Sequence, residues 1–210
     1  MTTDNYYNQM TDIHLDALRE IGNIGSGNAA TALSDMLMCK IDINVPVVKI
    51  LEYNEVVEAL GGPETMLLGV LLSLSGDVNG MMMFLQEKDF VHMTLNSLLQ
   101  QSFSDFNEID EMGYSAMQEV ANIMASSYVN AVGIMTGLNI YTSVPSVTVD
   151  MLGALLSVPA IYYADISEKI IFIDDSFTCL GNKTSSHILM IPDTKSLYKI
   201  MRNLGLEECN

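Results

Sequence analysis

Residues 16–27 read DALREIGNIGSG, and residues 115–126 read SAMQEVANIMAS. In both stretches positions 1, 5 and 8 are polar, and the positions between them are mostly apolar. On a helix with about 3.6 residues per turn, these offsets fall within roughly 60° of arc, so the polar side chains share one side. Each stretch therefore predicts an amphipathic helix whose polar stripe faces solvent or a partner. The two stripes consist of Asp16, Glu20 and Asn23, and of Ser115, Glu119 and Asn122.

A proline follows each stripe at the same distance. Pro46 lies 23 residues after Asn23, and Pro145 lies 23 residues after Asn122. If the helix continues to about Met36, it extends roughly 20 Å beyond Asn23, and a strand from about Lys40 to Pro46 returns about the same length. Each proline is therefore predicted to lie level with its asparagine. Since proline removes a donor from the hydrogen-bond ladder, its strand should lie at a sheet edge or bend there.

The residue types favour a site that a partner completes. An amide can hold a water by donating and accepting hydrogen bonds, but it takes no proton at neutral pH. A carboxylate can pair with a cation of the partner. These two groups suffice for phosphoryl transfer on a substrate with its own metal, because that reaction depends mainly on positioning and charge stabilisation. No histidine lies within helical reach of Ser115, which argues against nucleophilic catalysis.

The whole pattern, Ser or Asp, three residues, Glu, two residues, Asn, twenty-two residues and Pro, resembles the signature of the CheC/CheX/FliY phosphatases of bacterial and archaeal chemotaxis. The resemblance covers about residues 11–205, and both copies are intact, as in the CheC branch of the family. It implies a hydrolase that acts on the aspartyl phosphate of the response regulator CheY. The regulator would hold the Mg²⁺, so this chain is expected to need no metal or cofactor of its own.

The resemblance also implies a role for each position. The amides would align a water for in-line attack on phosphorus, and the carboxylates would contact the active-site lysine of the regulator. The first residue of each stripe would support that contact, and the prolines would shape the neighbouring strand. The catalytic set is Glu20, Asn23, Glu119 and Asn122, and the supporting set is Asp16, Ser115, Pro46 and Pro145.

Two other sequence features resemble catalytic motifs but do not predict a site. Residues 22–27 contain three glycines, yet no strand precedes them and no Gly-Lys-Ser/Thr follows, so a nucleotide loop is rejected. We interpret these small residues as allowing another helix to approach closely, despite the cost of glycine in a helix. The three histidines follow no metal-ligand pattern, and we expect surface or packing roles for His14, His92 and His187.

The composition of the 210-residue chain limits the classes of function. A formal charge of −17 argues against nucleic acid as a partner and favours a partner with a basic rim around its own site. The longest apolar run, Met151 to Ile161, is too short to span a membrane. The N-terminus lacks the pattern of a secretory signal, so we expect a cytoplasmic protein. Without CxxC spacing, Cys39, Cys179 and Cys209 are expected to be reduced thiols.

The order of predicted elements repeats along the chain. After a flexible segment 1–10, residues 11–106 and 107–206 are predicted to be two repeats within one domain. The expected helices span about 11–38, 55–60, 87–99, 107–136 and the residues from Asp193 to before Gly205. The expected strands span about 41–50, 66–74, 81–86, 139–149, 169–178 and 186–190. In the first of these strands, a period of two places four apolar residues on one face: Ile41, Ile43, Val45 and Val47.

Neither repeat has enough strands to bury its long helix alone. The fold class we predict is therefore an α/β (α+β) layered domain of two α-β-β-β-α halves that share one core around a pseudo-twofold axis. Its sheet should be largely antiparallel. We also expect the two stripes to lie on opposite faces of this domain and to act as separate sites.

The same resemblance leaves a second function open, that of a non-enzymatic interaction module. Proteins of this family also bind the receptor deamidase CheD, and related domains occur in the flagellar switch. A single Glu/Asn stripe is usually only a solvated helix face. Here the stripe and its proline occur twice at one spacing, so we favour the phosphatase, with phosphorylated CheY and CheD as expected partners.

Overall fold

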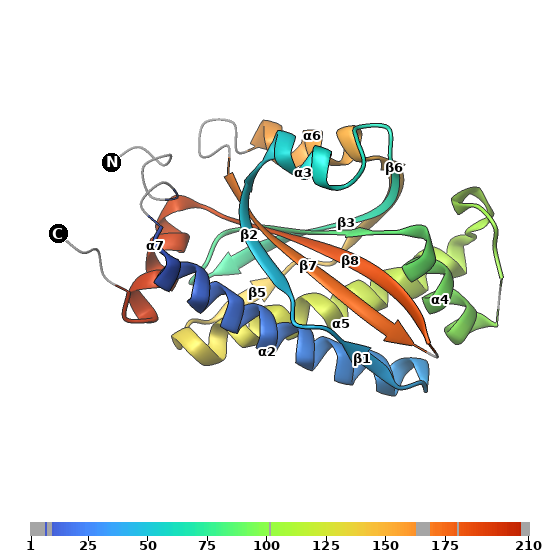
Figure 1. Ribbon diagram of the computed structural model, residues 1–210, viewed down its shortest axis with the longest axis horizontal. Coiled ribbons are helices and arrows are strands. Elements are labelled where there is room, and N and C mark those ends of the chain that lie inside the picture. The colour runs from blue at the N-terminus through green and yellow to red at the C-terminus, as the bar shows by residue number, and fades with distance from the viewer. Residues whose placement is uncertain (1–6, 8–9, 101, 163–168, 180, 207–210) are drawn as a thin grey trace.

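A computed structural model describes residues 7, 10–100, 102–162, 169–179 and 181–206 (Figure 1). Most of the segment predicted to be flexible, 1–10, lies outside the described residues, although Tyr7 within it is buried. The helices are α2 (Asp12–Leu37), α3 (Tyr53–Ala59), α4 (Lys88–Leu99), α5 (Glu111–Thr136), α6 (Leu152–Tyr162) and α7 (Thr194–Asn203), with a 3₁₀ turn at Phe106–Glu108. The strands are β1 (Ile41–Ile43), β2 (Val47–Glu52), β3 (Met66–Gly76), β4 (Gly80–Gln86), β5 (Ile140–Thr142), β6 (Ser146–Met151), β7 (Lys169–Cys179) and β8 (Asn182–Pro192).

The eight strands form one sheet in the order β1, β7, β8, β4, β3, β5, and β2 and β6 extend its two edges by pairing with β7 and β3. Every pairing is antiparallel. Each half places its edge strands on the hairpin of the other half, because β1 and β2 pair with β7 while β5 and β6 pair with β3. This exchange confirms the predicted fold class and shows that the halves share one core.

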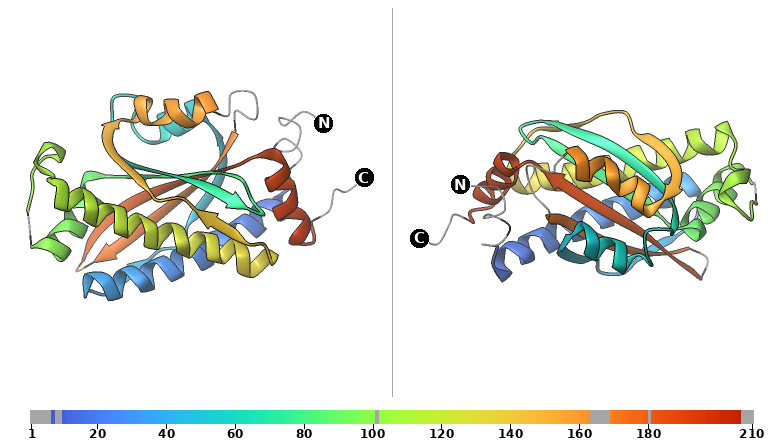
Figure 2. Two further views of the ribbon diagram at one scale, coloured as in Figure 1. Left: turned by 180° about the vertical axis from the view of Figure 1, so that it is seen from behind. Right: turned by 90° about the horizontal axis from the view of Figure 1, so that it is seen from above.

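The two faces of the sheet carry different helices (Figures 1 and 2). On one face α2 and α5 lie side by side and run in opposite directions, whereas α3 and α6 cover the other face. The larger core lies between the long helices and the sheet and contains Leu33, Phe84 and Met124, whereas Val56 and Leu156 belong to a smaller core under α3 and α6.

This arrangement shows where the helices that carry the two stripes lie relative to the sheet. The pseudo-twofold axis runs through the sheet rather than along it, so both long helices cover the same face. The two helices lie toward opposite edges of the sheet, α2 beside β1 and β2 and α5 beside β5 and β6.

Capping residues decide where the long helices begin and end. The α2 helix begins after Thr11, which forms a reciprocal capping box with His14. The α5 helix begins after Asp110, whose side chain accepts a hydrogen bond from the backbone of Gly113 at 2.8 Å. The predicted start at residue 107 was therefore too early, because Phe106–Glu108 forms a separate 3₁₀ turn.

Glycine in α2 permits the close approach that we predicted. A Cβ added to Gly25 would lie 2.6 Å from the ring of Tyr128 on α5. One turn earlier, a Cβ added to Gly22 would lie 3.1 Å from Val48 of β2. A Cβ added to Gly27 would have no atom within 4 Å, so close packing does not require a glycine at this position. The nucleotide-loop interpretation is excluded for the same segment, because all three glycines lie inside a continuous helix.

The first edge strand differs from its prediction. Residues 44–46 break it into β1 and β2, and the same break occurs at 143–145 between β5 and β6. The break shifts the pattern of burial by one residue, so Val45 and Val47 are exposed while Pro46 and Val48 are buried. A helix was also missed, since the apolar run at Met151–Ile161 was left unassigned and most of it forms α6.

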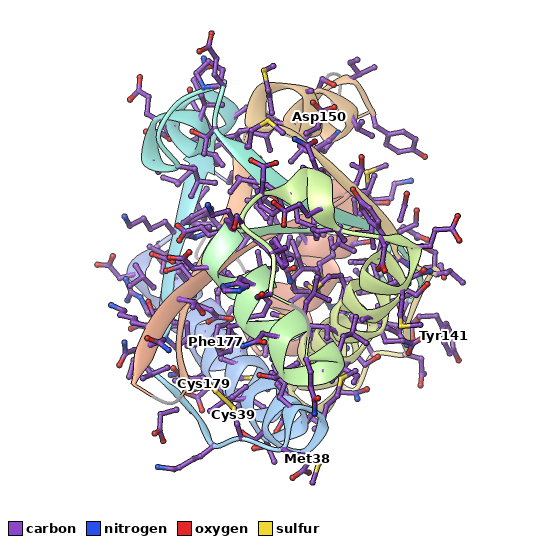
Figure 3. All side chains as sticks on the ribbon, turned by 90° about the vertical axis from the view of Figure 1, so that its right-hand side faces the viewer. Met38, Cys39, Tyr141, Asp150, Phe177 and Cys179 are labelled. Atoms are coloured by element: carbon purple, nitrogen blue, oxygen red, sulfur yellow. A yellow bond between two sulfur atoms is a disulfide. The ribbon has the colours of Figure 1, made fainter. Side chains whose placement is uncertain are left out.

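The cysteine prediction was wrong for two of the three residues. Cys39, just after α2, and Cys179, at the end of β7, form a disulfide across a sequence separation of 140 residues (Figure 3). The antiparallel pairing of β1 with β7 sets Ile41 opposite Cys179 and so brings Cys39 close. Nothing in the local spacing of the cysteines signals this contact. Cys209 lies outside the described residues.

Candidate functional site

The first stripe lies on the outer side of α2. Glu20 is exposed and Asn23 is half-buried, whereas Ile21 between them is buried against the core. One turn before Glu20, the exposed Asp16 accepts a hydrogen bond from Arg19 Nη1 at 2.5 Å. The helix therefore presents the three predicted positions to the surface together.

The second stripe is presented by α5 in the same way. Glu119 and Asn122 are exposed, and Val120 between them is buried. Ser115 Oγ donates a hydrogen bond to the carbonyl oxygen of Glu111 at 2.9 Å. Its hydroxyl is therefore bound to its own helix, as is common for serine within helices.

Each proline lies beside its stripe. Pro46 is buried in the break between β1 and β2, and a Cβ added to Gly22, next to Asn23, would lie 3.5 Å from its ring. Pro145 is buried in the matching break between β5 and β6. At the second stripe a hollow of about 230 Å³ is lined by Gln118, Glu119, Asn122, Thr142, Ser143, Val144 and Pro145. The structure thus places the proline level with the asparagine, as the spacing predicted.

The amide and carboxylate groups of the stripes are free to meet a partner. Within the described part of the chain, no residue forms a hydrogen bond or ion pair with the side chains of Glu20, Asn23, Glu119 or Asn122. An unpaired amide keeps two donors and one acceptor for a water, and an unpaired carboxylate can accept from a cation. The stripes can therefore position a water and bind a positively charged group at the same time.

Sequence reasoning missed the residue that precedes each glutamate. Arg19 precedes Glu20 and is paired with Asp16, and Gln118 precedes Glu119 and lines the hollow. A signal was present, since Arg19 is one of only nine basic residues in the chain and lies one turn after an acidic residue. The pairing leaves the first site with the same local charge as the second.

None of the three histidines is one of the stripe residues. His14 belongs to the cap of α2, and the ring of His92 packs against Phe103 with centroids 5.2 Å apart. His187 is buried, and its Nδ1 lies 3.0 Å from Asp174 Oδ1. Burial alone would lower the pKa of His187, but its acidic neighbours raise it above the usual value. Across the described residues, no group of three or more side chains is arranged to hold a metal ion.

A buried polar cluster ties the two long helices to the sheet. Ser26 Oγ of α2 donates to Asp175 Oδ1 of β7 at 2.6 Å, and the hydroxyl of Tyr128 on α5 donates to the other carboxylate oxygen. Burial raises the pKa of Asp175 to about 6, although these two hydroxyls oppose the shift. Burial and the nearby Asp175 raise the pKa of Tyr128 well above its usual value. The cluster supports the helices from behind and does not open onto either stripe.

Fold and site together define a class: a pseudo-symmetric α/β domain in which each half exposes one Glu/Asn stripe beside a buried strand proline. The CheC-like family profile matches residues 13–50 and 112–149, which contain both stripes and both prolines. The chain is 33% identical over 203 residues to the CheY-P phosphatase CheC of Bacillus subtilis (strain 168), and the match covers 95% of this chain and 97% of that protein. The chain belongs to the CheC-like family.

Solved structures share the fold at lower identity. FliY of Thermotoga maritima superposes with a TM-score of 0.74 at 20% identity, covering 95% of this chain and 99% of that one. The middle domain of FliM from H. pylori gives a TM-score of 0.69 at 11% identity, with coverage of 92% and 99%. These likenesses establish the architecture. Among the described helices, none is long and apolar enough to cross a membrane.

Proposed function

We propose that this protein hydrolyses the aspartyl phosphate of a phosphorylated CheY response regulator. The observation that carries the proposal is that each stripe lies at the surface beside its proline, with a glutamate and an asparagine whose side chains have no partner among the described residues. The relative in Bacillus subtilis, 33% identical over 95% of this chain, is a CheY-P phosphatase, which supports the same substrate here.

The mechanism follows from what an amide and a carboxylate can do. Asn23 and Asn122 each hold a water in line with the phosphorus of the docked regulator. Glu20 and Glu119 pair with the lysine of its active site and fix the docked pose. The regulator brings the acyl phosphate and its own Mg²⁺, so this chain contributes mainly positioning, which is enough to lower the barrier of phosphoryl transfer.

The supporting residues act through these groups. Asp16 holds Arg19 beside Glu20, and Ser115 is bound to its own helix, so neither is free to act as a nucleophile. Pro46 and Pro145 are buried and set the course of the strand beside each stripe. We assign all four to positioning rather than to chemistry.

Other partners follow from the family and from the charge. The formal charge of −17 suits a regulator with a basic rim around its phosphorylation site. By family resemblance we also propose the deamidase CheD as a second partner, which a pull-down with purified CheD would test. A cytoplasmic location is proposed because the phosphorylated regulator acts there.

The proposal is tested by phosphate release from phosphorylated CheY, with and without this protein. The wild-type protein should accelerate release, and the double variant Asn23→Ala/Asn122→Ala should lose the acceleration while it still binds the regulator. Each single variant should keep the turnover of the other site. A double variant with near-normal turnover would show that the amides do not position the water. A single variant without activity would show that the two stripes form one composite centre.

A further inference from the structure

Exposed apolar side chains flank both stripes at matching positions. Val45 and Val144 are 78% and 77% exposed, and Ile13 and Met112 are 64% and 61% exposed. Both pairs are separated by the same 99 residues as the stripes. Among the described residues, these are the only two pairs at that offset in which both positions hold an exposed large apolar side chain.

Exposed apolar residues elsewhere are not repeated. Ile134 on α5 corresponds to Asp35, and Tyr141 in β5 corresponds to Asp42. Burial in a core would account for repeated apolar residues, but these two pairs are exposed, so packing within the chain does not explain them. Single exposed apolar residues are common on protein surfaces, whereas a repeated pair at a site requires another contact.

The valines are held rigidly in the strand breaks. The residue before each valine is fixed by a backbone hydrogen bond. The N–H of Asn44 donates to the carbonyl oxygen of Ser176 at 3.2 Å, and the N–H of Ser143 donates to the carbonyl oxygen of Ser73 at 2.9 Å. The residue after each valine is a buried proline, which restricts the backbone of the valine to extended conformations. A β-branched side chain also has few rotamers, so little entropy is lost when a partner covers it.

The apolar residues bracket the polar groups of each site. Val144 lines the same hollow as Glu119 and Asn122. Met112 lies three residues before Ser115, which places it about one turn away on the same side of the helix. A polar centre with apolar contacts at both ends is the pattern of an interface whose outer contacts exclude water from a central charge pair.

We propose that two apolar contacts flank each stripe and pack against the phosphorylated regulator beside its acyl phosphate, namely Ile13 with Val45 and Met112 with Val144. This inference rests on the proposed function and adds the surface chemistry of the partner. The regulator must present apolar side chains on both sides of its phosphorylation site. These contacts shield the glutamate–lysine pair from water and so strengthen the binding of the regulator.

The test uses single-site proteins so that each pair is measured alone. In the Asn122→Ala background, Ile13→Ser/Val45→Ser should raise the KM for phosphorylated regulator by about tenfold or more, the loss expected for two apolar contacts. The kcat should change by less than about twofold, since the water-holding amide is intact. In the Asn23→Ala background, Met112→Ser/Val144→Ser should behave alike. Calorimetry with the regulator bound to Mg²⁺ and beryllofluoride, a stable mimic of the acyl phosphate, should show the same loss of affinity.

A matched control removes one exposed valine and one exposed isoleucine from α6. Val158→Ser/Ile161→Ser, made in each background, should leave KM within about twofold of its parent. If KM is unchanged in the stripe-flanking variants, or if only kcat falls, this inference is overturned. Either result leaves the proposed function intact. A wild-type protein that neither binds nor dephosphorylates the regulator would overturn both.

Discussion

The two stripes keep the same functional groups on very different supports. Both present Glu and Asn beside a buried proline and an exposed valine. In the first site Asp16 is paired with Arg19, and the second site has the uncharged Ser115 and Gln118 at those positions. The ion pair cancels itself, so the glutamate provides the net charge at both sites. What the duplication preserves is the free carboxylate, the free amide and the charge around them.

The supports behind the stripes differ in kind. Behind the first stripe, the hydroxyls of Ser26 and Tyr128 bind Asp175 between α2, α5 and β7, and a disulfide fastens the end of α2 to β7. The positions related by the duplication are apolar or glycine: Ala125, Ala29 and Leu72 for the cluster, and Leu138 and Gly76 for the disulfide. The α2 helix is thus linked to β7 by polar and covalent contacts, whereas the related positions of α5 and β3 are apolar or glycine. The difference shows that the stripe requires a fixed helix, and that several interactions can fix it.

The largest effect should come from reversing the charge shared by both sites. Glu20→Lys/Glu119→Lys should weaken regulator binding by about 100-fold or more, because two like charges then face each other in the docked complex. Each single variant should retain one binding site. Calorimetry against the regulator, with circular dichroism as a control for folding, checks this result. Unaltered binding by the double variant would mean that the glutamates do not face the lysine.

The next effect concerns the disulfide, which joins the end of α2 to β7 and has no counterpart at the end of α5. Cys39→Ser should lower the free energy of unfolding by about 2–4 kcal/mol, the usual contribution of a disulfide. In the Asn122→Ala background, where only the first site is active, Cys39→Ser should also reduce turnover. The same substitution in the Asn23→Ala background, where only the second site is active, should reduce turnover less. Urea unfolding with and without dithiothreitol checks the link. The reductant should destabilise the wild-type protein and leave Cys39→Ser unchanged; an equal response of both proteins would contradict the assignment.

The buried cluster, whose duplicated positions hold no polar group, predicts a pH dependence of stability. The pKa of Asp175 is raised from 3.8 to about 6 by burial, so the folded protein binds more protons than the unfolded chain between these values. Its contribution to stability is therefore fully present below pH 3.8 and is lost as pH rises through about 6, a change of about 3 kcal/mol. The free energy of unfolding of Asp175→Asn relative to wild type should rise across this window. If the difference in the free energy of unfolding between the two proteins stays constant with pH, the pKa of Asp175 is not raised by folding.

Much of this architecture could be predicted from the sequence, because its signals are local. The stripe periodicity predicted both long helices, and Asp193 predicted the start of α7, where it accepts a hydrogen bond from Ser196 at 2.7 Å. The 23-residue spacing predicted that proline and asparagine lie level, and Pro145 and Asn122 line one hollow. The helical period, the capping residues and the length of chain between asparagine and proline are all properties of residues close together in the sequence.

The features that escaped prediction depend on contacts between distant segments. α6 is apolar around much of its circumference and contains Pro159, so no period marks it, yet Leu155 packs onto the place left open at Gly69. The disulfide needs the pairing of β1 with β7. The alternation placed the exposed Val45 on the same face as the buried Ile41, because it assumed an unbroken strand. Each of these features depends on how the strands pair in the sheet, and the strand order could not be predicted from the sequence.

The smallest effect sharpens the comparison of the sites. Arg19→Gln leaves Asp16 unpaired and gives the first site one more negative charge than the second. If the glutamate meets a lysine, this charge should lower KM at the first site by about two- to fivefold at low salt, the usual range for an exposed pair.

The gain should fade as ionic strength rises, because exposed charges are screened over about 10 Å at 0.1 M salt. Asp16→Ser/Arg19→Gln reproduces the uncharged neighbours of the second stripe and serves as the matched control, since it leaves the net charge unchanged. Measured in the Asn122→Ala background, its KM should stay within about twofold of the parent. If Arg19→Gln raises KM instead, the arginine itself contacts the acidic residues around the acyl phosphate, and the two sites dock the regulator by different means.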